Sequence, residues 1–216
     1  MKLAVFDCDG TLVDGQASIC NAMDSAFAEV GLPAPDRNAV RRAVGLSLMQ
    51  AVRRLLPDAD DNTCRAITDA YKRAFRTARE EGSLSQPLYA GIPELLDDLR
   101  SGGWQLGVAT GMSDRGLAHC LASHGLNEHF VTLQTADRHP SKPHPSMLEE
   151  ALFEAAVQPA DTVMIGDTAY DMEMARSAGV RAIGVEWGYH PPEELTAAGA
   201  EFIAATPDQL RAYLMS

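Results

Sequence analysis

Four short segments of this chain carry side chains that could perform chemistry, and each comes after a run of apolar residues. They contain, in chain order, Asp7 and Asp9; Thr110 and Gly111; Lys142; and Asp167 with Asp171. Crowded carboxylates repel one another unless a cation shares their space. Oxygen ligands without His or Cys select a hard ion such as Mg²⁺. A lysine and a hydroxyl would remain to hold an anion beside the metal, and this combination suits phosphoryl transfer.

The predicted secondary structure explains how segments so far apart could meet. Strands are predicted over residues 2–6, 104–109, 130–134, 162–165, 181–185 and 201–204, and helices over 93–100, 115–124, 145–156, 171–178, 192–198 and 207–214. This alternation predicts an α/β, Rossmann-like core in which a parallel sheet has helices on both faces. Ligands of such sheets bind beyond the carboxyl ends of the strands, where we expect all four segments to lie.

The stretch between the first two strands carries only helical patterns, over residues 16–30, 36–43, 47–56 and 62–81. We therefore predict an all-helical cap of residues 16–85, inserted into a catalytic core of residues 1–15 and 86–216. Hinges are expected near Asp14 and over residues 83–89. The charge of the helical stretch differs from that of the chain as a whole. Residues 16–87 hold ten Lys or Arg and nine Asp or Glu, which nearly cancel, whereas the whole chain has a net charge of −12.

The overall composition narrows the classes of partner. The chain has 216 residues, and its 46% hydrophobic and 22% charged content is typical of a globular protein. No apolar stretch approaches the roughly 20 residues of a membrane span, and no signal-peptide pattern is seen, so we expect a cytoplasmic protein. A strongly acidic chain repels nucleic acid and anionic membranes, and we expect neither as a partner. The sequence leaves a monomer and a homodimer open.

The four segments resemble, in order, the four motifs of the haloacid dehalogenase-like hydrolase superfamily. The matching stretches are Asp7-Cys8-Asp9-Gly10-Thr11, Ala109-Thr110-Gly111, Lys142-Pro143-His144-Pro145 and Gly166-Asp167-Thr168-Ala169-Tyr170-Asp171. The helical insertion is similar to the small cap of that family. Residues 141–145 and 187–190 are similar to its phosphoglycolate phosphatase-like members.

This resemblance implies a Mg²⁺-dependent phosphatase that hydrolyses a small phosphorylated metabolite, with phosphoglycolate as one candidate, through an aspartyl phosphate. It implies that Asp7 is the nucleophile and Asp9 the general acid–base. Gly10 would allow backbone N–H groups to approach the phosphate, and Thr110 with the Gly111 N–H would bind phosphoryl oxygens.

The resemblance also implies the charged partners of the reaction. Lys142 would neutralise charge on the phosphoryl group and on Asp7. The Mg²⁺ ligands would be Asp7, Asp9 through its backbone carbonyl, and Asp167, with Asp171 in an outer, water-mediated shell. Two of these residues have simpler interpretations: Lys142 as a solvated surface charge, and Asp171 as a helix cap.

Substrate choice is expected to come from the cap and the nearby loop. Arg42 and Ser47 lie where the cap of related proteins dips toward the active site, and could bind a substrate carboxylate or hydroxyl; a basic cap surface is the alternative. Arg115 is a further candidate. Met112 and Asp114 stand where close relatives are expected to carry basic residues, which argues against an acidic substrate.

Two other functions remain open at this stage. A sugar-phosphate phosphomutase would share all four motifs and would return the phosphoryl group to a sugar instead of to water. A non-catalytic metabolite-binding protein could use the same fold. A dehalogenase is disfavoured, because the dehalogenase members lack an acid at the position of Asp9.

Overall fold

A computed structural model describes all residues from 1 to 216. Its centre is a six-stranded sheet in which every neighbouring pair is parallel, in the order β3-β2-β1-β4-β5-β6. The strands are β1 (Lys2–Phe6), β2 (Trp104–Thr110), β3 (Thr132–Thr135), β4 (Thr162–Gly166), β5 (Arg181–Val185) and β6 (Phe202–Ala204). The predicted α/β fold with a parallel sheet is therefore confirmed.

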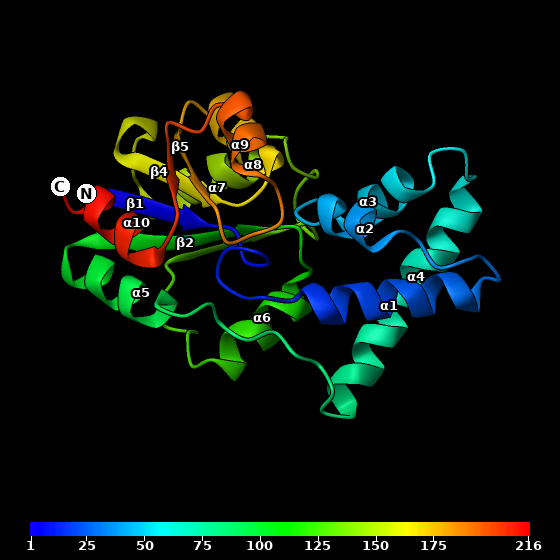
Figure 1. Cartoon of the computed structure of the whole chain (residues 1–216). Helices are drawn as coiled ribbons and strands as arrows, with labels where there is room; N and C mark the ends of the chain where they lie inside the picture. The colour runs from blue at the N-terminus through cyan, green and yellow to red at the C-terminus, as the bar shows by residue number, and fades with distance from the viewer.

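Helices cover both faces of this sheet, as Figure 1 shows. One face carries α5 (Ile92–Ser101), α6 (Asp114–Ser123) and α10 (Pro207–Leu214), and the other carries α7 (Ser146–Ala155), α8 (Ala169–Ser177) and α9 (Pro192–Ala198). The central strand β1 is apolar on both sides for this reason. Ala4 and Phe6 join the core on one face, and Leu3 and Val5 join the core on the other.

Four further helices lie at the end of the sheet opposite the two termini (Figure 1). These are α1 (Gln16–Glu29), α2 (Arg37–Ala43), α3 (Leu48–Leu55) and α4 (Asp61–Glu80). They enclose a hydrophobic core of their own, made of ten buried residues between positions 19 and 70. A separate core supports the proposed division between residues 16–85 and the rest of the chain.

The two connections between the helical part and the sheet run side by side. The Asp14 N–H donates to the Pro87 carbonyl at 2.8 Å, and Val13 forms an antiparallel bridge with Leu88. Both segments lie where the sequence predicts hinges.

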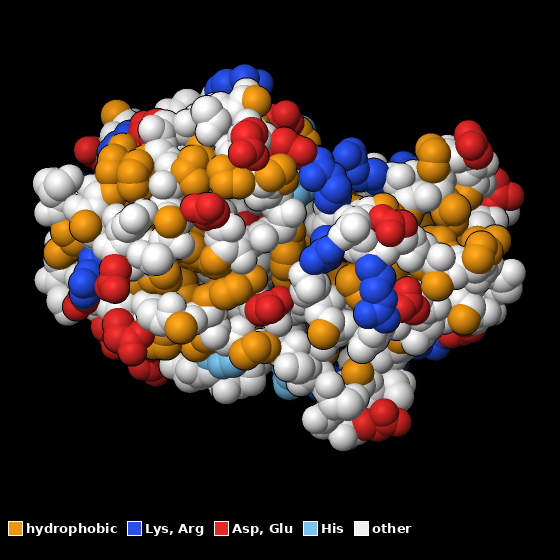
Figure 2. Space-filling view, viewed as in Figure 1, with side chains coloured by type: hydrophobic (Ala, Val, Ile, Leu, Met, Phe, Trp, Pro, Cys, Tyr) orange, Lys and Arg blue, Asp and Glu red, His pale blue; other side chains and the backbone are white.

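Figure 2 shows Lys and Arg side chains gathered over the helical part where it meets the sheet domain. No helix of the protein is both long enough and apolar enough to cross a membrane.

The register of β1 with its neighbours brings the strand ends into line. Phe6 lies opposite Val108 of β2 and Ile165 of β4. The residues that follow these strands therefore lie at one edge of the sheet, the edge that faces α1–α4.

Candidate active site

Asp7 is the first residue after β1, and its carboxylate is almost completely buried, with 1% of the residue exposed. One oxygen, Oδ1, accepts the Cys8 N–H at 2.7 Å and lies 3.0 Å from the Lys142 ammonium. The other oxygen, Oδ2, is buried and has no hydrogen-bond partner. Burial is the main reason that the pKa of Asp7 rises to about 6, against the lowering effect of Lys142. The group is therefore ionised at neutral pH and has one oxygen free to react.

Lys142 reaches the same place from the loop between β3 and α7. Its Nζ lies 2.6 Å from Asp171 Oδ1 and 3.0 Å from Asp7 Oδ1, and its side chain is fully buried. The two carboxylates hold the pKa of Lys142 above its ordinary value despite the burial. This arrangement does not match the solvated surface charge that the sequence left open. Lys142 instead places a fixed positive charge beside Asp7.

Asp171 has both oxygens engaged by the protein. Oδ1 accepts from Lys142, and Oδ2 accepts from the Thr168 N–H and hydroxyl in a capping box at the start of α8. This capping box makes α8 begin at Ala169, two residues before the predicted start. Asp171 thus completes the capping box of α8, whose N-cap is Thr168, and is also a partner of Lys142.

Asp167 follows β4 and is fully buried. Its Oδ1 accepts the Thr11 hydroxyl at 2.8 Å, and its Oδ2 accepts the Tyr189 N–H at 2.9 Å. Gly10, with φ at +86°, packs so closely that any Cβ there would overlap the Asp167 carboxylate. Burial, and then the charges of Asp7 and Asp171, hold the pKa of Asp167 well above its usual range.

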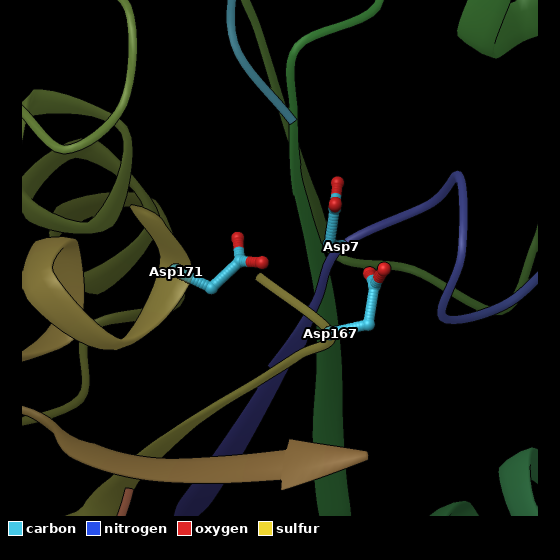
Figure 3. A group of neighbouring side chains, drawn as sticks. All are labelled: Asp7, Asp167 and Asp171. Atoms are coloured by element: carbon cyan, nitrogen blue, oxygen red, sulfur yellow. The ribbon is translucent and has the colours of Figure 1, made fainter. Parts of the chain in front are cut away.

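Asp7, Asp167 and Asp171 form a cluster in which one oxygen of each lies within 4.8 Å of the others. Figure 3 shows that the three side chains come from the end of β1, the loop after β4, and α8, and are directed toward a common space. All the donors are carboxylate oxygens, which suits a hard divalent cation such as Mg²⁺. The unpartnered Asp7 Oδ2 and the raised pKa of Asp167 are both relieved by positive charge. The residues present therefore fit the metal implied by the resemblance.

Asp9 lies outside this cluster and faces the helical part. Its Oδ1 accepts a 3.4 Å hydrogen bond from the side chain of Gln86, a residue that the sequence did not single out. Burial, followed by the charge of Asp7, raises the pKa of Asp9 to about 7. A carboxyl group with such a pKa can donate and accept a proton near neutral pH, as a general acid–base must.

Thr110, at the end of β2, is also buried. Its oxygen accepts the Met112 N–H at 3.2 Å, and the N-cap of α6 is Ser113. Its hydroxyl donates to no other group of the protein, so its proton is available to a ligand. Gly111 packs against the loop between α2 and α3, and a Cβ at Gly111 would overlap the Leu46 carbonyl oxygen.

A cavity of about 550 Å³ separates this sheet edge from α1–α4. Asp7, Asp9, Thr110 and Gly111 line one side, and the opposite wall contains apolar side chains of α1 and α4, such as Met23, Tyr71 and Phe75. Asp9 and Thr110 thus line the same cavity as Asp7. The volume lies within the range of sites for small organic ligands.

The three residues proposed for substrate binding on the cap side lie in different environments. Ser47 and Arg115 line the cavity. Arg42 is not among the lining residues; its guanidinium donates twice to the Glu194 carboxylate of α9, at 2.7 Å each. No sequence pattern could have paired these two residues, which are 152 positions apart. Arg42 therefore joins the helical part to the sheet domain.

The sequence of this chain matches the family described as haloacid dehalogenase-like hydrolase over residues 4–185. It is 36% identical to the probable phosphatase IndB of Dickeya dadantii (strain 3937), over 94% of this chain and 89% of that protein. It is 28% identical to a phosphoglycolate phosphatase of Vibrio vulnificus (strain CMCP6), over 97% of this chain and 94% of that protein.

The fold is likewise similar to solved structures. A crystal structure of a predicted phosphatase from Clostridium acetobutylicum superposes with a TM-score of 0.89 at 26% identity, covering 99% of this chain and 98% of that one. The similarity extends through the helical insertion as well as the sheet domain, because nearly the whole of both chains is covered.

Proposed function

Because this chain belongs to the haloacid dehalogenase-like hydrolase family and is a phosphatase, we propose that it hydrolyses a small phosphorylated metabolite through an aspartyl phosphate, with Mg²⁺ as cofactor. The observation that carries this proposal is the state of Asp7. One oxygen is fixed by Lys142 and the Cys8 N–H, whereas the other is buried without a partner, in a residue that lines the cavity. Such a carboxylate is oriented for attack and needs an electropositive group beside it.

We propose the following roles for this chain's residues. Asp7 attacks phosphorus, so that a new oxygen–phosphorus bond forms as the bond to the ester oxygen breaks. Asp9 gives its proton to the leaving alkoxide and then takes a proton from the water that hydrolyses the aspartyl phosphate. Thr110 and the Gly111 N–H hold phosphoryl oxygens, and Lys142 offsets their charge.

We propose that Asp7, Asp167 and the Asp9 carbonyl would hold the Mg²⁺, with Asp171 acting from outside through Lys142 and water. The ion would supply positive charge that lowers the repulsion between the phosphate and the carboxylates. Phosphoglycolate is a candidate substrate, since relatives carry that name. We further propose that the protein acts in the cytoplasm as a monomer or homodimer, without nucleic acid or membrane partners.

A hydrolysis panel tests the proposal. Phosphoglycolate, pyrophosphate, sugar phosphates and nucleotides are incubated with the protein, with and without Mg²⁺, and released phosphate is measured. We expect hydrolysis that requires Mg²⁺ and is abolished in Asp7→Asn, with an unchanged circular dichroism spectrum. Asp14→Asn, the same change at an exposed residue of the same loop, is the matched control and should retain turnover.

Two results would contradict the proposal. Near-normal turnover in Asp7→Asn would remove Asp7 from the mechanism. Conversion of one glucose phosphate isomer into another, without phosphate release, would identify a phosphomutase.

A further inference from the structure

One face of α4 lines the cavity along most of the helix. Its lining residues are Thr68, Tyr71, Lys72, Phe75, Arg76 and Arg79. Their spacing of three and four places is that of a single helical face. At 1.5 Å per residue, this face extends about 17 Å from Thr68 to Arg79. A two-carbon phosphate ester at Asp7 would leave most of the 550 Å³ cavity filled with water.

The cavity wall changes from apolar to basic along α4. Its middle is apolar and aromatic: the rings of Tyr71 and Phe75 lie 5.0 Å apart, and Met23 and Met112 also line the cavity. Its end, near the start of α6, is basic, because Arg76 and Arg79 of α4 and Arg115 of α6 line the cavity together. Only the last of these was singled out from the sequence.

The three arginines at this end of the cavity have no acidic partner, although the chain as a whole is acidic. None of Arg76, Arg79 and Arg115 forms an ion pair within 4 Å or donates a side-chain hydrogen bond to another residue, in a chain with thirty acidic residues. By contrast, Arg73, on another face of α4, pairs with Glu29.

Arg79 gives a second, independent indication. Its Nε is buried and has no hydrogen-bond partner, and leaving a buried donor unpaired costs stability. Burial, followed by the positive charges of Arg115 and Arg76, lowers the pKa of Arg79. The position of Arg79 in the last turn of α4 is favourable for the helix dipole, but this accounts neither for the unpaired Nε nor for the approach of Arg115. Arg76 and Arg115 are exposed to solvent, whereas Arg79 is half-buried between them. An anion bound beside Arg79 would offset the repulsion from its two neighbours.

We propose that Arg76, Arg79 and Arg115 bind a second anionic group of the substrate, so that the enzyme prefers phosphate esters bearing a carboxylate or second phosphate beyond an apolar or aromatic section. This proposal rests on the proposed function only for the position of the reacting phosphate. Met112 and Asp114 supply no basic group, and in this proposal the basic groups are Arg76 and Arg79 of α4 together with Arg115 of α6. The guanidinium fork pairs with carboxylate and phosphate in the same bidentate geometry.

A length series provides the test. ω-Phosphooxy alkanoic acids with one (phosphoglycolate), three, five and seven methylene groups are compared with their uncharged primary amides, and alkanediol bisphosphates form a separate arm. The measured quantity is the ratio of kcat/KM for acid over amide at each length. The variants are Arg79→Gln and Arg115→Gln, and Arg73→Gln on the same helix is the matched control.

We expect the ratio to reach about tenfold or more at one of the longer chains, the lower range for a charge-assisted hydrogen bond. It should fall toward one in Arg79→Gln and Arg115→Gln and keep its normal value in Arg73→Gln. The bisphosphate arm shows which anion is preferred. A ratio below about two at every length, or one that neither variant changes, would overturn the proposal.

A binding measurement separates this proposal from the phosphatase mechanism. Calorimetric titration of Asp7→Asn protein with the same acids and amides gives the preference as a ratio of Kd values, without turnover. Retained preference with no hydrolysis of any ester by the normal enzyme would refute the proposed function and leave the anion site standing. Hydrolysis without a preference for the acids over the amides would refute the anion site and leave the proposed function standing.

Discussion

Replacing Lys142 with Met tests the electrostatic organisation of the site most directly. Lys142 is the one buried Lys or Arg side chain of the protein, and its Nζ lies between Asp7 and Asp171. Met keeps most of the side-chain volume and removes the charge. Removing one partner of a buried ion pair costs about 3–5 kcal/mol, because the remaining charge is left uncompensated. For a domain of this size each kcal/mol lowers Tm by about 2–4 °C, so we expect a drop of roughly 6–20 °C.

The drop in Tm caused by Lys142→Met should itself depend on pH. The pKa of Asp7 is about 6 with Lys142 present, and it should rise further when the attraction of the ammonium is lost. A carboxyl group whose pKa is higher in the folded state than in the unfolded state, where it is about 3.9, favours unfolding as the pH rises between the two values. The difference in Tm between the normal protein and Lys142→Met should therefore narrow from pH 7 to pH 5.

Thermal unfolding followed by circular dichroism at pH 5, 6 and 7, with EDTA to exclude divalent cations, measures both effects. Lys72→Met is the control, because Lys72 is exposed and forms no ion pair; its effect should stay within about 0.5 kcal/mol. Equal Tm values for Lys142→Met and the normal protein at pH 7, or a difference that grows at pH 5, would refute the reasoning.

Three further predictions concern other parts of the site. Asp9→Asn should lower kcat by about 10²–10⁴. The loss should be larger for an alkyl phosphate than for 4-nitrophenyl phosphate, because the 4-nitrophenolate leaving group needs less protonation. Equal losses of kcat for the two substrates would argue against an acid role for Asp9. Gly111→Ala should push the Leu46 carbonyl away and lower kcat/KM several-fold, and a normal steady-state value would contradict the close packing. Burial lowers the pKa of His190, so its neutral form stabilises the fold above about pH 6.5 and this contribution is lost as the pH falls. The Tm of the normal protein should thus decrease more between pH 7 and 5 than that of His190→Gln.

The site residues at the carboxyl edge of the sheet could be predicted from sequence, because the position of each depends on the strand next to it in the chain. A short apolar strand followed by acids or a hydroxyl fixes what stands at the strand end, and parallel strands bring their carboxyl ends to one edge. Asp7 and Asp167 directly follow β1 and β4 in this way, and Thr110 is the last residue of β2. Lys142 is a harder case, since a loop separates it from β3. Only the order of the motifs indicated its role, and the distances to Asp7 and Asp171 come from the structure.

Long-range pairs were beyond local patterns. Arg42 was expected to bind substrate because the cap of related proteins dips inward near this position, yet its guanidinium pairs with Glu194. Its carbonyl also accepts the Tyr170 hydroxyl at 3.0 Å and lies 3.2 Å from the His190 ring. These contacts depend on how the helical part is oriented over the sheet, and that orientation is set by many weak contacts rather than by a motif.

Helix α4 explains why specificity is harder to predict from sequence than catalysis. A 3.6-residue period distinguishes an apolar face from a polar face, and in α4 the apolar face includes Ile67, Tyr71 and Phe75. The helix in fact has three environments, because Ile67 enters the core of the helical part while Tyr71, Phe75 and Arg79 line the cavity. A basic residue facing a cavity and one facing bulk water have the same spacing on an isolated helix. The two kinds of basic residue differ only in which other part of the protein faces them. Arg79 is faced by Arg115, which belongs to a helix that begins more than thirty residues later in the chain. The reacting group is thus specified by residues next to their strands, whereas the remainder of the substrate is selected by two surfaces that meet only in the folded protein.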